Sequence, residues 1–288
     1  MSPSLRLNTV KIRRHRWCFE DVGNRDWLAG SAAVSRWFDV YTLLVPDNES
    51  FYIRTLRQCT VDAAIDEFDS AELFRFFRQE SLHGIAHRAY WRKMRDLGIE
   101  YSDFLRFINW VLYSVVEPKQ CLRIRISMVA AIEHVNACLG NTVLKGDLFV
   151  NATGSLRKMF YWHFAEEIEH KAVAHKVLDR LYPGYFNRIF GALIAFPAFF
   201  CAVFVGTAYL LSKEGKFLTR RTATELFKFW IRDGVLKDLA FHLCRYFRTS
   251  FEPWELNDHH LASSAELPIR RNSPLSKSSR SLSTLLRL

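Results

Sequence analysis

The sequence predicts an all-α fold on three observations. Apolar residues recur at helical spacing along most of the chain, and alternating strand patterns with hairpin turns are absent. Turn-forming residues are scarce, with 12 Gly and 8 Pro among 288 residues, whereas Phe alone contributes 24. A chain of this length can bury one large core or two small ones. We therefore expect long helices packed around a common core.

Four parts are expected along the chain. Residues 1–30 form an irregular basic segment, and 31–185 form a helical bundle. Apolar and amphipathic helices occupy 186–250, and the Ser- and Arg-rich tail over 256–288 is expected to be disordered. The periodicity indicates helices over 31–44, 70–97, 103–116, 121–144, 153–181, 187–212 and 220–248. A separate helix is expected to start at "PDNESFYIRTLRQ" (46–58), because Pro46, Asp47 and Asn48 precede an amphipathic run.

The charge and the cysteines restrict the function classes. A net charge of +10 suits nucleic acid, an anionic membrane or simple solubility. No zinc finger, RNA-binding motif or base-reading basic helix accompanies it, so we expect no nucleic-acid partner. The N-terminal segment has no apolar stretch typical of a secretion signal, and the six cysteines never approach metal-binding spacing. We expect free thiols and a cytoplasmic protein.

Two segments concentrate ionisable residues among aromatic ones. In "WHFAEEIEHKAVAH" (162–175), helical geometry places His163, Glu167 and His170 on one stripe, with Glu166 at its edge and Glu169 turned away. His175 lies on another face, where we expect a structural role.

The segment "FFRQESLHGIAHRAYW" (76–91) aligns Glu80, His83 and His87 in the same way. Both segments contain Glu-x-x-His, which lets a carboxylate and an imidazole of one helix reach one metal ion. A single such motif is more often a solvated helix face.

Two Glu-x-x-His helices facing each other, with one Glu from each of two further helices, form the dinuclear site of ferritin-like bundles. Residues 128–139, "MVAAIEHVNACL", supply Glu133 as the only acid of an apolar helix. Glu49 supplies the second single Glu and comes first along the chain, although a Glu in the first turn of a helix is also favoured by the helix dipole. The predicted metal ligands are Glu49, Glu80, His83, Glu133, Glu167 and His170. Four further residues are expected to be additional ligands, partners that orient a ligand, or buried core residues: His87, His134, His163 and Glu166.

Four blocks carry a family resemblance: "PDNESFY", "RQESLHGIAH", "AAIEHVNA" and "WHFAEEIEHKAVA", together spanning about 45–180. At these blocks the chain resembles a bacterial family of predicted metal-dependent hydrolases. Asn48 replaces an expected glycine, and His175 stands where the family more often has an aromatic residue. The resemblance implies a metal site at Glu80, His83, Glu133, Glu167 and His170, and its first block carries Glu49.

Three functions fit such a site. Carboxylate-rich ligation favours two divalent ions, first iron and otherwise manganese or zinc, and our leading hypothesis is oxidative chemistry on an apolar or lipid-like substrate. The alternative is the hydrolysis that the family label names, through a metal-activated water. Iron oxidation or storage is the third.

A membrane is the other expected partner. Residues 189–211 contain no charge over 23 positions, and 225–247 are amphipathic, basic and aromatic. Basic residues flank the apolar run on both sides, so no single-span orientation is favoured. We expect a cytoplasmic bundle attached to the inner membrane through 187–247. The alternatives are a buried bundle helix or an interface between subunits, such as a homodimer.

Overall fold

The computed structural model describes residues 11–62 and 67–263, and within them the all-α prediction is confirmed. No strand occurs in these residues, where Leu28 and Ala152 form an isolated bridge. The α-helices are α1 (Ala32–Asp62), α2 (Glu67–Asp96), α3 (Ser102–Asn109), α4 (Leu122–Lys145), α5 (Gly154–His170), α6 (Val173–Leu181), α7 (Tyr185–Lys213), α8 (Arg220–Phe227) and α9 (Val235–Arg245). Shorter turns are the π-helices η2 (Trp110–Val116) and η4 (Lys228–Arg232) and the 3-10 helices η3 (Glu117–Lys119) and η5 (Pro253–Glu255). Of the tail expected over 256–288, residues 256–263 are described and are packed on the bundle, where the buried Asp258 binds Lys171. The remainder, from 264 onward, lies outside the described residues.

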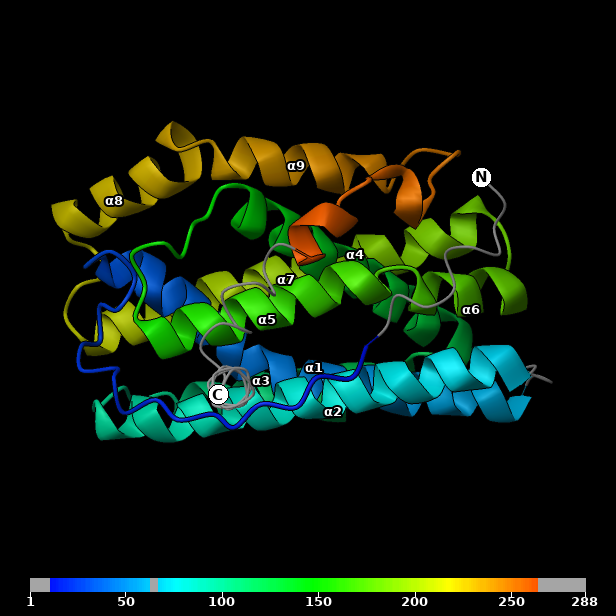
Figure 1. The fold of residues 1–288 in the computed structure, drawn as a ribbon, viewed down its shortest axis with the longest axis horizontal. Helices are drawn as coiled ribbons and strands as arrows, with labels where there is room; N and C mark the ends of the chain where they lie inside the picture. The colour runs from blue at the N-terminus through cyan, green and yellow to red at the C-terminus, as the bar shows by residue number, and fades with distance from the viewer. Residues whose placement is uncertain (1–10, 63–66, 264–288) are drawn as a thin grey trace, which may run out of the picture.

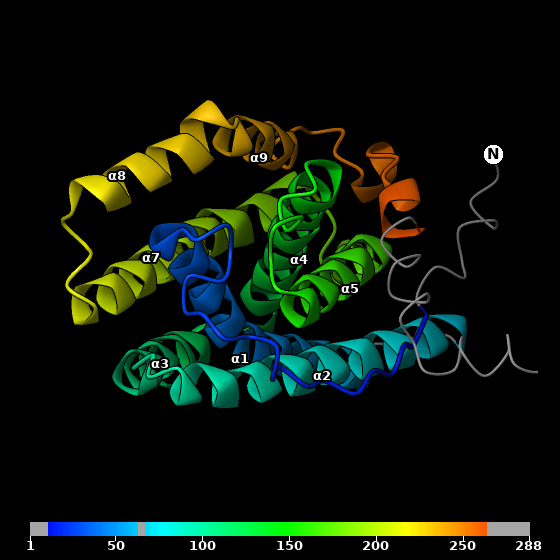
Figure 2. The ribbon, with the colours of Figure 1, turned by 60° about the vertical axis from the view of Figure 1, so that its left-hand side comes forward.

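The helices form layers that place α2 and the α8–α9 pair on opposite sides of the molecule (Figures 1 and 2). Helices α1, α4, α5 and α7 lie between them, and one continuous apolar core connects these elements. Aromatic rings fill much of this core, with Phe149 and Phe160 stacked at a centroid separation of 4.7 Å. Flat, rigid aromatic side chains therefore form a large part of the interior beside the aliphatic ones, as the Phe content predicts.

Helix α1 contradicts the predicted start at Pro46, because it runs without a break from Ala32 to Asp62 with Pro46 inside it. A proline within a helix leaves the carbonyl four residues earlier without its donor. That carbonyl belongs to Thr42, and the Trp91 indole Nε1–H donates to it at 3.1 Å. A side chain from α2 thus replaces the missing hydrogen bond, and Glu49 lies in mid-helix instead of in a first turn.

Two other predicted helices are interrupted. The helix expected over 153–181 is divided into α5 and α6 at Lys171 and Ala172, where the buried Lys171 ammonium binds Asp258 at 2.5 Å. The helix expected over 220–248 is divided into α8, η4 and α9, and Gly234 before α9 adopts φ +77°. The ion pair joins residues 87 positions apart, so the periodicity of one segment cannot reveal it.

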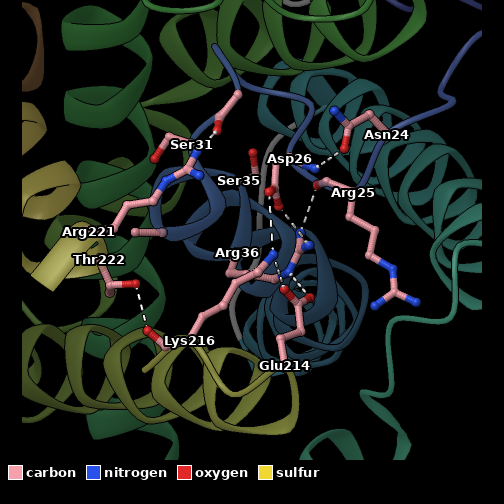
Figure 3. Close-up of polar contacts among 12 residues, drawn as sticks. Asn24, Arg25, Asp26, Ser31, Ser35, Arg36, Glu214, Lys216, Arg221 and Thr222 are labelled. Carbon is pink, nitrogen blue, oxygen red and sulfur yellow. Dashed lines mark hydrogen bonds and ion pairs between the residues drawn. The ribbon is translucent and has the colours of Figure 1, made fainter. Parts of the chain in front are cut away.

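The basic N-terminal segment is anchored near the middle and at the end of α2. Gln79 of α2 donates to the Lys11 carbonyl, and Arg25 donates to the Leu97 carbonyl at the end of α2. Figure 3 shows the buried Arg36 of α1 at the centre of a second anchor, beside Asp26 and Glu214. The guanidinium joins the N-terminal segment to the end of α7, which fixes residues 11–30 over the bundle.

Helix α7 packs one face into the bundle and exposes the other. Gly191 lies against the backbone of α4, and a Cβ there would lie 2.1 Å from Ser127 Oγ. The opposite face exposes apolar residues at helical spacing, which we name the α7 stripe: Phe186, Phe190, Leu193, Pro197, Cys201 and Phe204. Among the described residues α7 is the helix long and apolar enough to cross a membrane, and 44% of its apolar window is buried in the protein.

Candidate metal centre

Four helices bring the predicted ligands together in the interior. Helix α1 supplies Glu49, and α4 supplies Glu133. Each Glu-x-x-His pair lies on a single helix, one on α2 and the other on α5. The side chains are at most 2% exposed: Glu49, Glu80, His83, Glu133, Glu167 and His170. This is the arrangement that the helical spacing predicts, although ligand roles stay a prediction.

Glu80 lies between the two motif histidines. Its Oε2 is 3.8 Å from His83 Nδ1, and its Oε1 is 3.2 Å from His170 Nε2. Glu167 Oε1 also lies 3.8 Å from His83 Nδ1, while Glu49 Oε1 lies 3.2 Å from the same nitrogen. One carboxylate thus presents a different oxygen to each imidazole, as a ligand that bridges two positions would.

Two overlapping groups of four side chains can each place one ligand atom per residue within 4.8 Å of the others. The first combines Glu49, His83, His163 and Glu167, and the second combines Glu80, His83, Glu167 and His170. Glu133 belongs to neither group; its Oε2 accepts a hydrogen bond from His170 Nδ1 at 2.8 Å, and its Oε1 is buried without a partner. His163, predicted only as a possible additional ligand, thus belongs to one of these groups, while the ligand role of Glu133 stays a prediction.

The ligand atoms lack other partners. Both oxygens of Glu49, Glu80 and Glu167 are buried without a hydrogen bond, as are His83 Nδ1 and His170 Nε2. Burying unpaired carboxylates costs several kcal/mol each unless a cation offsets them. Carboxylate oxygens and imidazole nitrogens are ligands of iron, manganese and zinc. The unpartnered atoms converge on one another, so the residues fit a bound divalent metal.

The charges of the cluster are strongly coupled. Burial raises the pKa of Glu49, Glu133 and Glu167 well above that of an ordinary glutamate, and neighbouring carboxylates such as Glu80 raise the pKa of each further. Burial lowers the pKa of His83, but the hydrogen bond to Glu166 and the surrounding carboxylates outweigh it and raise that pKa well above its ordinary value. A divalent cation would relieve this excess of negative charge.

The outer side of His83 is held by Glu166. His83 Nε2 lies 3.0 Å from Glu166 Oε2, and Glu166 Oε1 accepts from Trp162 Nε1 at 2.8 Å and from Arg13 Nη1 at 3.0 Å. Arg13 also binds Glu169, which faces away from the ligands. A carboxylate on one imidazole nitrogen directs the lone pair of the other toward a metal. Glu166 has this position relative to His83.

A second buried chain leads away from the cluster. His163 Nε2 lies 3.0 Å from Glu167 Oε1 and 2.9 Å from the Tyr41 hydroxyl. On its other side, His163 Nδ1 lies 3.1 Å from His87 Nε2. Burial and the positive charge of His83 lower the pKa of both His163 and His87 well below the ordinary value, so both rings are neutral at neutral pH.

Some residues of the sequence analysis lie elsewhere, and others were missed. His134 points away from the ligands, with Nε2 3.2 Å from the His242 carbonyl and its ring 4.9 Å from that of Tyr246. His175 packs its ring against Phe251. Arg13, Tyr41 and Tyr52 adjoin the cluster but were not predicted. Tyr41 and Tyr52 precede Glu49 by eight residues and follow it by three, which a search of the α1 face around Glu49 could have found.

The comparisons with known proteins identify the family of the chain. A family model described as "Predicted metal-dependent hydrolase" matches residues 11–257, which is most of the chain and includes every residue of the cluster. The same comparisons give no match to a curated protein or to a solved structure. The chain belongs to the family of predicted metal-dependent hydrolases.

Proposed function

We propose that this chain is a hydrolase that holds two divalent ions between α1, α2, α4 and α5. The observation that carries the proposal is the convergence of buried, unpartnered ligand atoms around Glu80, in a chain of this family. Bound there, a divalent ion supplies a water of lowered pKa and polarises the bond to be cleaved. The two oxygens of Glu80, each facing a different histidine, support a pair of ions.

The protein's own residues hold the site and carry the proton. Glu166 orients His83, and Glu133 orients His170 through its Nδ1. The neutral His163 ring, hydrogen-bonded to Tyr41 and to His87, links Glu167 to groups farther from the ligands and can relay a proton along this chain without holding the charge. Burial of every ligand excludes bulk water, which strengthens these electrostatic interactions.

Metal content and hydrolysis test the proposal. Purified full-length protein should retain divalent metal, and Glu80→Ala and Glu167→Ala should each lose it. Glu72→Gln is the matched control, because Glu72 lies two turns before Glu80 on α2 and pairs with Lys176 outside the cluster. Zinc- or manganese-loaded protein should hydrolyse model aryl esters, amides or phosphate esters. Metal binding without turnover on any of these classes would contradict the proposal.

Oxidative chemistry is a second candidate, favoured by the donor set. Glu49, Glu80, Glu167, the unpartnered Oε1 of Glu133 and the two motif histidines come from four helices, and this donor set suits iron or manganese better than zinc. Ferrous iron added without air and then exposed to dioxygen should be oxidised stoichiometrically with dioxygen uptake if this candidate holds. Hydrolytic turnover in the absence of dioxygen would favour the hydrolase instead.

We further propose that the α7 stripe and the α8–α9 layer attach the protein to an anionic membrane surface in the cytoplasm. The α7 stripe extends about 27 Å along the helix without a charge. Between residues 213 and 248 there are nine Lys or Arg and four Asp or Glu, and this segment also exposes Leu218, Phe227 and Phe241. Apolar side chains beside positive charge suit anionic lipid headgroups. Because the other face of α7 is packed on α4 and α1, attachment along the surface fits better than a span surrounded by lipid.

Vesicle sedimentation tests this attachment. Full-length protein should sediment with vesicles containing phosphatidylglycerol and less with pure phosphatidylcholine vesicles. Phe190→Ser with Phe204→Ser should weaken the binding, whereas Phe74→Ser, which is 61% exposed on α2, should not. If the stripe is a dimer interface, the double variant would instead change the mass measured by light scattering and leave vesicle binding unaltered.

A further inference from the structure

A narrow apolar cavity lies between α1, α4, α7 and the π-helix η2. Its volume is about 60 Å³. This is several times what one water requires and well below the roughly 150 Å³ of a cavity that takes up benzene. Buried side chains such as Leu44, Tyr52 and Phe199 line its inner part. Partly exposed Glu117, Gln120 and Arg125 line its outer part. The cavity is therefore a slot that opens toward the surface.

The inner end of the slot adjoins the metal ligands. Tyr52 lines the slot and follows Glu49 by three residues on α1, so the two side chains lie on the same face of that helix. The Tyr52 side chain is 1% exposed, and its hydroxyl has no hydrogen-bond partner. Burial raises the pKa of Tyr52 well above its ordinary value, and the carboxylates of Glu133 and Glu167 raise it further. The hydroxyl thus stays protonated beside the cluster as a donor without an acceptor.

The walls of the slot come from α7 on one side and η2 on the other. Ala195, Ala198 and Ala202 of α7 line the slot, and their small side chains leave the room for it. On the opposite wall, η2 has no fully buried residue, and π-helical segments recur at functional sites.

We propose that this slot binds the linear hydrocarbon chain of an acyl ester or amide and that the Tyr52 hydroxyl donates to its carbonyl oxygen. The inference rests on the proposed hydrolase function and names its substrate class. Water adds to the acyl carbon, the bond from that carbon to the alkoxy oxygen or amide nitrogen breaks, and the leaving group takes a proton from the water. The products are a carboxylic acid and an alcohol or amine. A narrow apolar slot admits an unbranched chain and rejects rings and branches.

Binding tests the slot independently of turnover. A fluorescent linear fatty acid is titrated into metal-loaded and chelator-treated full-length protein. Ala202→Leu narrows the slot, and the matched variant Ala208→Leu narrows a separate apolar cavity of about 380 Å³ on the other side of α7. We expect Ala202→Leu to weaken binding at least tenfold and Ala208→Leu to leave it unchanged, with both variants melting as the wild type does. If Ala202→Leu binds the fatty acid as the wild type does, or if Ala208→Leu loses as much affinity, the slot is not where the hydrocarbon chain binds.

Turnover tests the substrate class and the donor. The ratio kcat/KM should rise with acyl length along a series of linear nitrophenyl esters and fall for branched or aromatic acyl groups. Tyr52→Phe should lower kcat about 100-fold with metal content and fatty-acid binding unchanged, as expected for the loss of a carbonyl donor. If kcat/KM does not depend on acyl length and Tyr52→Phe keeps the wild-type kcat, this inference is refuted while the hydrolase function still stands. If no ester or amide is cleaved, the hydrolase function fails, and the fatty-acid titration still decides whether the slot binds a chain.

Discussion

Replacing Glu166 by Gln should weaken metal binding without removing any ligand. Both Glu166 oxygens accept hydrogen bonds, Oε2 from His83 and Oε1 from Trp162 and Arg13. A Gln amide offers only one oxygen, so in either orientation its NH₂ group faces a donor, which is the His83 ring or the Trp162 and Arg13 pair. The imidazole of His83 is then no longer held with Nδ1 toward Glu49 and Glu80.

The expected loss follows from this geometry. Removing a carboxylate that orients a ligating histidine lowers metal affinity about 10- to 100-fold. This corresponds to about 1.4–2.7 kcal/mol, at about 1.36 kcal/mol for each factor of ten. A ligand variant such as Glu167→Ala should lose far more, because it removes donor atoms from both groups of the cluster.

The assay is a competition titration of manganese or zinc against a chromophoric chelator with full-length protein. Glu169→Gln is the control, because Glu169 lies on the same helix and binds the same Arg13, whereas Glu166 contacts His83. We expect its affinity to stay within about threefold of the wild type. Unchanged affinity in Glu166→Gln, or an equal loss in Glu169→Gln, would show that the geometry of His83 is not what Glu166 controls.

Three further predictions concern the scaffold. Gly191→Ala places a methyl group against the α4 backbone and should cost about 3 kcal/mol of unfolding free energy by urea denaturation, and a loss under 1 kcal/mol would contradict close packing there. Trp91→Phe leaves the Thr42 carbonyl without its donor and should cost about 1–3 kcal/mol; full stability would mean that another group satisfies it. Burial lowers the pKa of His134 to about 3, whereas in the unfolded chain it is near 6.5. The unfolded state therefore binds more protons in this interval, and the contribution of His134, complete above pH 6.5, is lost as the pH falls toward 3. Between pH 6.5 and 3, the unfolding free energy of chelator-treated wild type should fall more steeply with decreasing pH than that of His134→Asn. Equal dependence on pH in the two proteins would contradict the lowered pKa of His134.

The sequence predicts the parts of the site that depend on one helix at a time. A separation of three residues places Glu80 with His83, and Glu167 with His170, whatever the rest of the chain does. The same geometry distinguishes His163 from His134. His163 shares the stripe of Glu167, whereas His134 directly follows Glu133 and is rotated by about 100° from it. The helical period therefore selects the histidine that lies in the cluster.

Features that depend on contacts between distant segments are not visible in the sequence. Arg13 and Glu166 are 153 positions apart, and nothing in the basic N-terminal segment distinguishes Arg13 from its neighbours. Likewise, the sequence around Pro46 predicts a helix start, because Trp91, whose indole N–H takes the place of the missing backbone donor, belongs to another helix. Local helix propensity considers a residue without its tertiary contacts. Here the contact with Trp91 allows α1 to continue through Pro46.

The two sides of the cluster differ in a way that determines how a substrate can reach it. On the side of the N-terminal segment, Arg13 is bound to Glu166 and Glu169 above the ligands, and opening this side would strand partly buried charges. On the side of α7, the inner wall consists of apolar side chains and the unpartnered Tyr52 hydroxyl, and the ion pair of Glu117 with the half-exposed Arg54 lies at the outer rim. Since the ligands are at most 2% exposed, a substrate must displace one wall or the other. The α7 side opens at lower cost and borders the face that we assign to the membrane. An apolar chain drawn from a lipid layer would therefore arrive with its reactive end at the ligands.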